Sequence, residues 1–299
     1  MGLKIFLSFM FVMFCIGILI VYWFIPFGTI EFGTKSSEFN LINQSGDMQF
    51  YQNMRYSDSK ISYRIFDCPL QKRNDMESAF WIISNLSILN FDSVDYEEEI
   101  SVTCDSKNRI EEGLFIAGEG GPVNITKGDN FNVILKGEVL LIKDSNCENP
   151  NVALHELLHA LGFNHSDNEN NIMYPISNCK QTIGADIIAL IDELYSTPSQ
   201  PDFVLKDVSA VMHGKYLDVN MSIKNNGVRD SEEAKVLIYA DDKLVKEIEL
   251  DALKIGYGRI ISLSNLWVSQ INVNQLDFVV DYNFPELEKN NNRISLKVN

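Results

Sequence analysis

The chain has 299 residues, of which 41 are acidic and 25 are basic, and its formal net charge at pH 7 is −16. This balance excludes nucleic acid as an expected partner, because phosphate contacts need an excess of Lys and Arg. It excludes binding to generic anionic surfaces for the same reason. The acidic surplus mostly indicates solubility.

The first predicted element is an almost wholly apolar run over residues 5–27, long enough for the about 20 helical residues that span a bilayer. It exceeds the apolar core of a signal peptide and lacks a small-x-small cleavage pattern, which favours an uncleaved anchor over a cleaved signal peptide. Lys4 precedes the run and Glu31 follows it, a charge bias that places the N-terminus inside. We expect a single-pass anchor at 1–27, a polar tether at 28–47 and the remaining chain outside the cell membrane.

Residues 48–198 are predicted to form an α+β domain. We expect a strand near 61–66, a helix near 71–88, strands over 90–142, a helix from residue 150 and a last helix over 183–196. In the helix from residue 150, Asn149 is the predicted N-cap, Pro150 takes the first helical position, and apolar residues supply a buried face.

This helix carries a cluster of potential metal ligands. His155 and His159 lie four residues apart, so a helix presents both imidazoles on one face, with Glu156 beside them. Gly162 can end the helix in a left-handed conformation, and the departing chain can bring His165 back as a third ligand. Three protein ligands leave a fourth position open, as in catalytic rather than structural zinc sites.

Coincidence explains this pattern poorly. Five specified positions recur by chance roughly once in a few million start positions. The alternative, a core helix with incidental histidines, would bury two imidazoles and a carboxylate on one turn at a large cost in free energy.

The pattern HExxHxxGxxH, followed by Met173 within residues 171–175, resembles the metzincin signature. Ser166 and the Met-Tyr-Pro turn are most similar to the matrixin branch of these zinc peptidases. The resemblance implies a twisted, mostly parallel sheet, a single catalytic zinc ion on the three histidines, Glu156 as general base, and Met173 as an apolar floor that does not bind metal. It extends to residues 61–65, like the first matrixin strand, and 183–195, like the last helix.

The resemblance also suggests where a peptide would bind. Residues 131–135 and 139–142 are predicted strands above the site, and in metzincins an edge strand pairs with the extended peptide. We expect residues 118–122 in a loop leading to that edge. Residues 176–182 are expected to shape the pocket for the side chain that follows the cut.

Four cysteines lie within the α+β domain, and Cys15 lies in the apolar run. An even set suggests two disulfides and an exterior location; the alternative is four free buried thiols. Of the three connectivities, we favour a bond between the ends of two neighbouring strands and a bond flanking the active-site helix and the Met-turn. These pairs are Cys68 with Cys104 and Cys147 with Cys179.

Neither a cysteine that blocks the zinc nor a second zinc ion is expected. Residues 28–47 are short and contain no cysteine that could block the zinc, and His213, the remaining histidine, lies outside the catalytic region, which excludes a second, structural zinc. Structural Ca²⁺ is possible, but no clear loop supports it.

After a proline-rich break at residues 197–201, residues 199–299 contain six or seven short β-rich segments, which suggests a small all-β sandwich. Residues 222–227 and 286–292 resemble CARDB-like, immunoglobulin-like domains of surface proteins. Such a domain would act as a spacer or as a receptor for a surface protein or glycan. The predicted segments are 216–223, 234–239, 244–250, 259–263, 276–282 and 293–298.

The sequence therefore predicts a membrane-anchored extracellular zinc endopeptidase that acts on peptides or proteins. One alternative is a catalytically inactive adhesion or scaffolding protein. Another is a zinc hydrolase that cuts cell-wall amides.

Overall fold

The computed structural model describes residues 6, 10–11, 13–14, 16–17, 29–33, 48–107, 109–111, 114–143, 147–270 and 272–298. Most of the predicted anchor, including Cys15, and most of the predicted tether lie outside these residues. Within the described part of the chain, no helix is long and apolar enough to cross a membrane.

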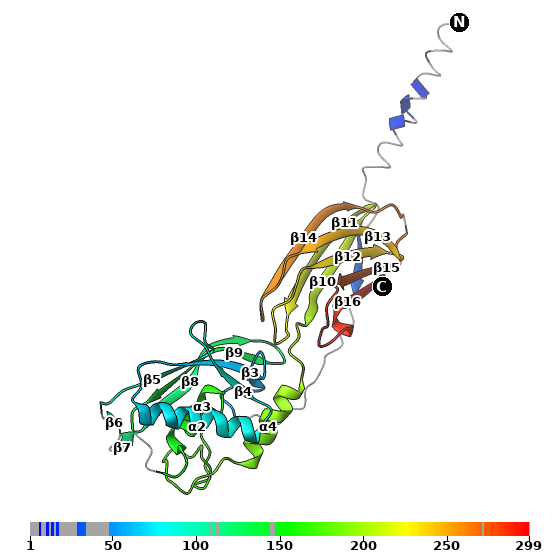
Figure 1. Cartoon of the computed structure of the whole chain (residues 1–299). Helices are drawn as coiled ribbons and strands as arrows, with labels where there is room; N and C mark the ends of the chain where they lie inside the picture. The colour runs from blue at the N-terminus through cyan, green and yellow to red at the C-terminus, as the bar shows by residue number, and fades with distance from the viewer. Residues whose placement is uncertain are drawn as a thin grey trace.

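From residue 48 onward the chain forms two units (Figure 1), and each unit has its own large hydrophobic core. The first belongs to a mixed α/β unit and the second to an all-β unit, in the order that the sequence predicted. The helices of the first unit are α2 (Leu70–Leu86), α3 (Asn151–Ala160) and α4 (Ala185–Ser196). Its strands are β2 (Met54–Tyr56), β3 (Lys60–Ile65), β4 (Asn90–Ser93), β5 (Ile100–Cys104), β6 (Arg109–Glu111), β7 (Leu114–Ile116), β8 (Gly118–Lys127) and β9 (Asn132–Leu141).

The main sheet of the first unit is mostly parallel. Its strand order is β2-β9-β5-β3-β4, with parallel pairing throughout, and β8 pairs antiparallel with β9. Among the described residues β8 has no other partner strand, so it is an edge strand; β6 and β7 form a separate hairpin. Residues 118–122, which we expected in a loop, are the first half of β8. Glycine and proline disfavour strands, which misled the prediction, but a close approach to α3 requires glycine here.

The helices match their predicted positions within three residues. In α2, Met76, Ala79, Phe80 and Ile83 recur at helical spacing and are buried. Helix α3 is buried on nearly every side. It begins at Asn151, with Pro150 rather than Asn149 at the cap position and without a side-chain capping bond.

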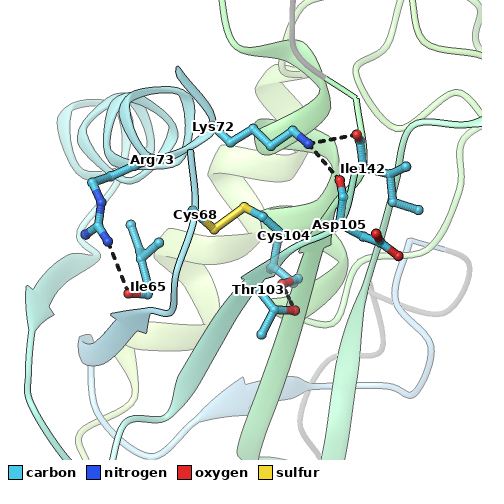
Figure 2. Close-up of a disulfide and its surroundings, with 9 residues drawn as sticks. Ile65, Cys68, Lys72, Arg73, Thr103, Cys104, Asp105 and Ile142 are labelled. Carbon is cyan, nitrogen blue, oxygen red and sulfur yellow. Dashed lines mark hydrogen bonds between the residues drawn. A yellow bond between two sulfur atoms is a disulfide. The ribbon is translucent and has the colours of Figure 1, made fainter. Parts of the chain in front are cut away.

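Two disulfides link the first unit, in the pairing expected from the sequence. The Cys68–Cys104 bond joins the segment before α2 to the end of β5 (Figure 2). Beside it, the buried Lys72 donates hydrogen bonds to the carbonyls of Asp105 and Ile142, at 2.7 and 2.8 Å. The Cys147–Cys179 bond joins the segment before α3 to the segment after the Met-turn.

The second unit is an all-β structure with strand order β13-β12-β15-β16-β1-β10-β11-β14. Along β12, buried and half-buried residues alternate, as expected for a strand with one face on a core. Its strands are β10 (Phe203–His213), β11 (Tyr216–Asn225), β12 (Ala234–Ala240), β13 (Lys243–Leu250), β14 (Gly258–Trp267), β15 (Gln275–Asp281) and β16 (Arg293–Val298), with a short 3₁₀ helix η1 (Asn290–Asn292).

The first strand of the chain also belongs to this unit. Strand β1 (Thr29–Gly33) pairs with β10 through Thr29 to Glu31 and with β16 through Phe32 and Gly33. The sequence analysis assigned residues 28–47 to a tether and predicted no strand there. The pattern of five residues is too short to reveal partners that lie far away in the sequence.

Asp129, in the turn between β8 and β9, faces the second unit. Its carboxylate accepts hydrogen bonds from Lys206, from Lys224 at 3.1 Å and from Asn226 at 2.8 Å. Burial raises the pKa of Asp129, but the hydrogen bonds from these partners outweigh that effect and hold the pKa at about 2. The contact therefore joins the two units through a charged carboxylate at neutral pH.

This contact predicts a pH dependence of stability. A carboxyl group whose pKa is depressed in the folded state stabilises the fold above its unfolded pKa, here 3.8, and loses that contribution as the pH falls towards 2. Because the side chain is 42% exposed, we expect Asp129→Asn to cost only about 1 kcal/mol or less at pH 6. The cost should shrink as the pH falls from about 4 and should vanish below pH 2. Urea unfolding of both proteins would measure it, and a cost independent of pH would contradict the assignment.

Candidate metal centre

The structure brings the three predicted histidine ligands together. The Nε2 atoms of His155 and His159 on α3 lie 3.0 Å apart. Gly162, with φ of +96°, ends the helix: its N–H donates to the His159 carbonyl, and the next N–H donates to the Leu158 carbonyl. The chain then returns, and Nε2 of His165 lies 3.1 Å from Nε2 of His159.

Hydrogen bonds fix the orientation of the two helical imidazoles. Nδ1 of His155 donates to the carbonyl of Ile172 at 2.7 Å, and Nδ1 of His159 donates to the carbonyl of Phe163 at 2.8 Å. Since a carbonyl only accepts, each Nδ1 carries the proton, and in the neutral imidazole Nε2 then carries the lone pair. Two lone pairs that face each other at 3.0 Å repel unless a cation lies between them. The donor set therefore fits a metal ion, and three imidazoles suit zinc.

The electrostatics of the histidines agree with this fit. Burial lowers the pKa of His155 and of His165, and burial together with His155 lowers the pKa of His159 to about 4. All three imidazoles are therefore neutral at pH 7, which is the form that binds metal.

Glu156 lies on the same turn and is only 6% exposed. Burial, and secondarily the Glu119 carboxylate on β8, raise the pKa of Glu156 to about 8. Without a neighbouring cation this side chain holds a proton at neutral pH. A cation beside it favours the carboxylate and lowers this pKa, so a bound metal ion would make the group a proton acceptor.

Strand β8 lies so close to Glu156 that only glycine fits at the two nearest positions of the strand. A Cβ atom on Gly118 would lie 2.7 Å from the Glu156 Cγ, and one on Gly120 would lie 2.2 Å from the Glu156 carbonyl oxygen. Sequence reasoning missed this contact and the influence of Glu119. The alternation of glycines on either side of Glu119 is the signal that could have revealed it.

The Met-turn and the third histidine are joined. Met173 is buried, and its carbonyl accepts a hydrogen bond from the Ser166 N–H at 2.9 Å. Asn171 accepts from the Met173 N–H through its side chain, at 2.9 Å. Because Ile172 also holds His155, the turn positions residues on both sides of the site.

A segment that the sequence analysis did not single out also supports the site. The Phe50 N–H donates to the Gly162 carbonyl at 3.0 Å, and the Asn164 N–H donates to the Met48 carbonyl at 2.9 Å. The ring of Phe50 stacks on His159 with centroids 5.7 Å apart. No motif in the sequence marks this contact.

Two protein families match this chain, and the boundary between them coincides with the boundary between the two hydrophobic cores. Residues 55–196 match the family model for matrixin, and residues 200–296 match the family model for CARDB. The chain joins a matrixin-like domain to a CARDB domain.

The individual proteins that this chain is similar to share less than 30% of their residues with it. Macrophage metalloelastase from Rattus norvegicus is 27% identical over 171 residues, which cover 49% of this chain and 35% of that protein. The chain thus spans about a third of the length of that relative. Two solved structures are similar to about a third of this chain. One, the CARDB domain of a Pyrococcus furiosus protein in complex with di-metal ions, has 18% identity, covers 33% of this chain and 88% of that one, and gives a TM-score of 0.28. The other, a domain described as part of a cell surface protein of Methanosarcina acetivorans, has 19% identity, covers 33% and 91%, and gives 0.26.

A prediction concerns the third ligand of the matrixin-like domain. His165→Ala should weaken zinc binding by more than the about 10–100-fold that loss of an outer-shell partner costs. The fold should persist, since His165 is the most exposed of the three ligands. Competition with a chromogenic chelator would measure the affinity. His213→Ala, in the CARDB domain, is the matched control and should leave it unchanged; equal affinities in both variants would exclude His165 as a ligand.

Proposed function

We propose that the matrixin-like domain is a zinc-dependent endopeptidase with one catalytic ion. The observation that carries this proposal is the convergence of three imidazole nitrogens, two of them fixed by carbonyl hydrogen bonds, beside a buried glutamate. The likeness to a protein named for metalloelastase activity supports the same class of reaction.

His155, His159 and His165 would hold the ion. When bound, zinc polarises a substrate carbonyl and lowers the pKa of water beside it. The Glu156 carboxylate takes a proton from the attacking water and returns it to the leaving amine. Its burial supports this role, because a base with a pKa near the working pH can both accept and donate a proton.

Strand β8 would hold the substrate. As an edge strand it presents backbone N–H and C=O groups that an extended peptide can pair with. Gly118 and Gly120 bring this edge against the Glu156 turn, so a paired peptide would pass beside the catalytic carboxylate.

Digestion tests distinguish this activity from its rivals. We expect the full chain to cleave casein and generic peptides, to lose this activity with a chelator, and to regain it with added zinc. Cleavage of cell-wall fragments but not of casein would indicate an amidase that acts on walls. Failure to cleave either, despite bound zinc, would favour an adhesion or scaffolding protein.

We propose further that residues 1–27 anchor the protein in the cell membrane with both domains on the extracellular side. The length of the apolar run supports an anchor, and the two disulfides support an oxidising exterior. Because β1 starts at Thr29 and pairs with CARDB strands, the anchor would attach at the CARDB domain. Extraction of membranes at alkaline pH and protease treatment of intact cells would test this; release into the soluble fraction would contradict it.

A further inference from the structure

We propose that the CARDB domain braces the β8–β9 hairpin and so positions the edge strand beside Glu156. The expected effect on peptide kinetics rests on the proposed peptidase function. The claim that the CARDB domain holds the hairpin depends only on the contact between the two domains.

An apolar cluster forms the centre of that contact. Phe131, just before β9, and Val133, within it, pack with Val228 and Ile255 of the CARDB domain, and all four are at most 7% exposed. Leu287, which is partly buried, also packs against the cluster. A separate core of this kind fixes the hairpin end more firmly than a flexible linker would.

Beside the cluster, a polar contact holds the turn of the hairpin and a close packing contact holds the end of β8. Asp129, in the turn, binds Lys206, Lys224 and Asn226 as described above. Gly256 approaches Thr126 on β8 so closely that a Cβ atom on the glycine would lie 2.3 Å from the threonine Cγ2. Substitution of that glycine is also disfavoured by its φ of +72°.

The connection between the domains is itself held in place. The buried Arg55 of β2 donates to the carbonyls of Leu194 and Thr197, the latter at 2.8 Å, at the end of α4. Its guanidinium lies 4.4 Å from the centre of the Tyr195 ring. Nearby, the Ser57 hydroxyl donates to the Val228 carbonyl at 2.7 Å. The Arg55 bonds join β2, which pairs with β9, to the end of α4, and the Ser57 bond joins the residue after β2 to Val228 of the CARDB domain.

Strand β8 connects this contact to the site. Its far end meets the CARDB domain at Thr126, and its near end lies against Glu156 at Gly118 and Gly120. Between the ends, its register with β9 shifts at Asn124, and such irregularities bend a strand. Among the residues that the structure describes, β9 is the one partner strand of β8. A bent strand paired on one side needs a further contact to hold its position, and the CARDB domain supplies it.

The test uses the full chain and opposes like charges at the contact. Asp129→Lys places a third amine against Lys206 and Lys224. We expect hydrogen exchange of residues 118–127 to rise about tenfold, a local opening that leaves the rest of the matrixin-like domain protected. KM for an extended peptide should rise severalfold, while zinc content and kcat stay near the wild-type values.

Control variants distinguish a displacement of β8 from a general loss of stability. Asp92→Lys makes the same charge change against Lys60, on the opposite side of the sheet, and should leave exchange in β8 unchanged. Adding Lys206→Asp and Lys224→Asp to Asp129→Lys should restore protection. If Asp129→Lys does not fold, Ile255→Ala provides a milder change at the apolar cluster and should raise the exchange of β8 in the same way.

The proposal would be overturned if residues 118–127 of Asp129→Lys exchanged hydrogen at the wild-type rate. Where that variant does not fold, the same result in Ile255→Ala would overturn it. So would an equal rise in Asp92→Lys. If the wild-type chain cleaves no peptide, the proposed function fails, but the exchange measurement still decides whether the CARDB domain holds β8.

Discussion

Replacing Glu156 by glutamine is expected to lower kcat for peptide cleavage by about 10²–10⁴-fold, the usual contribution of a positioned general base. Glutamine can neither take a proton from water nor return one to the leaving amine. The fold should persist, because burial already favours the neutral form of Glu156, which glutamine resembles in shape and charge. Steady-state kinetics, zinc analysis and thermal unfolding would measure the three quantities.

Glu119→Gln is the matched control. It removes a carboxylate that raises the pKa of Glu156 without touching the general base itself. We expect kcat to change little at neutral pH and the acidic limb of the pH profile to move to lower pH. A Glu156→Gln protein that holds zinc and keeps the wild-type kcat would exclude Glu156 as the base.

The second large effect is expected from Gly120→Ala. The new methyl group would lie 2.2 Å from the Glu156 carbonyl oxygen, so β8 or α3 must move. Overpacking of this kind typically costs about 1–3 kcal/mol of stability. Because the displaced strand also positions the substrate, KM should rise together with the loss of stability. Denaturant unfolding and peptide kinetics would show both effects.

Gly121 provides the comparison for this substitution. A Cβ atom at Gly121 meets no atom within 4 Å, although the residue is the immediate neighbour on the same strand. Gly121→Ala should therefore be nearly neutral in stability and in KM. Equal effects at the two positions would mean that the close approach to α3 does not constrain β8.

The metal ligands could be predicted from the sequence because their geometry is local. His159 lies four positions after His155, and helical periodicity places both on one face. The left-handed conformation of Gly162 was likewise readable from the residue type, and the structure has it. The carbonyl partners of the histidines, Ile172 and Phe163, depend on the path of the following chain, which no spacing rule supplies.

Elements that depend on distant partners could not be read in the same way. Strand β8 is rich in residues that disfavour strands, and its position is set by contacts with β9 and α3. Strand β1 takes its place only because β10 and β16 leave a pairing position between them. The contact between the domains combines Asp129 with lysines and an asparagine from beyond residue 200. Two of these residues fall in the CARDB-like segment 222–227, but nothing in the sequence points to Asp129 as their partner.

The measurement that tests the account most directly is a zinc titration of the metal-free full chain during peptide cleavage. The site has one set of three convergent imidazoles among the described residues, so the initial rate should rise linearly and saturate at one equivalent of zinc. The same titration of His165→Ala should need much more zinc. Peptide cleavage by the metal-free chain, or no cleavage after one equivalent has bound, would contradict the assignment of a zinc peptidase.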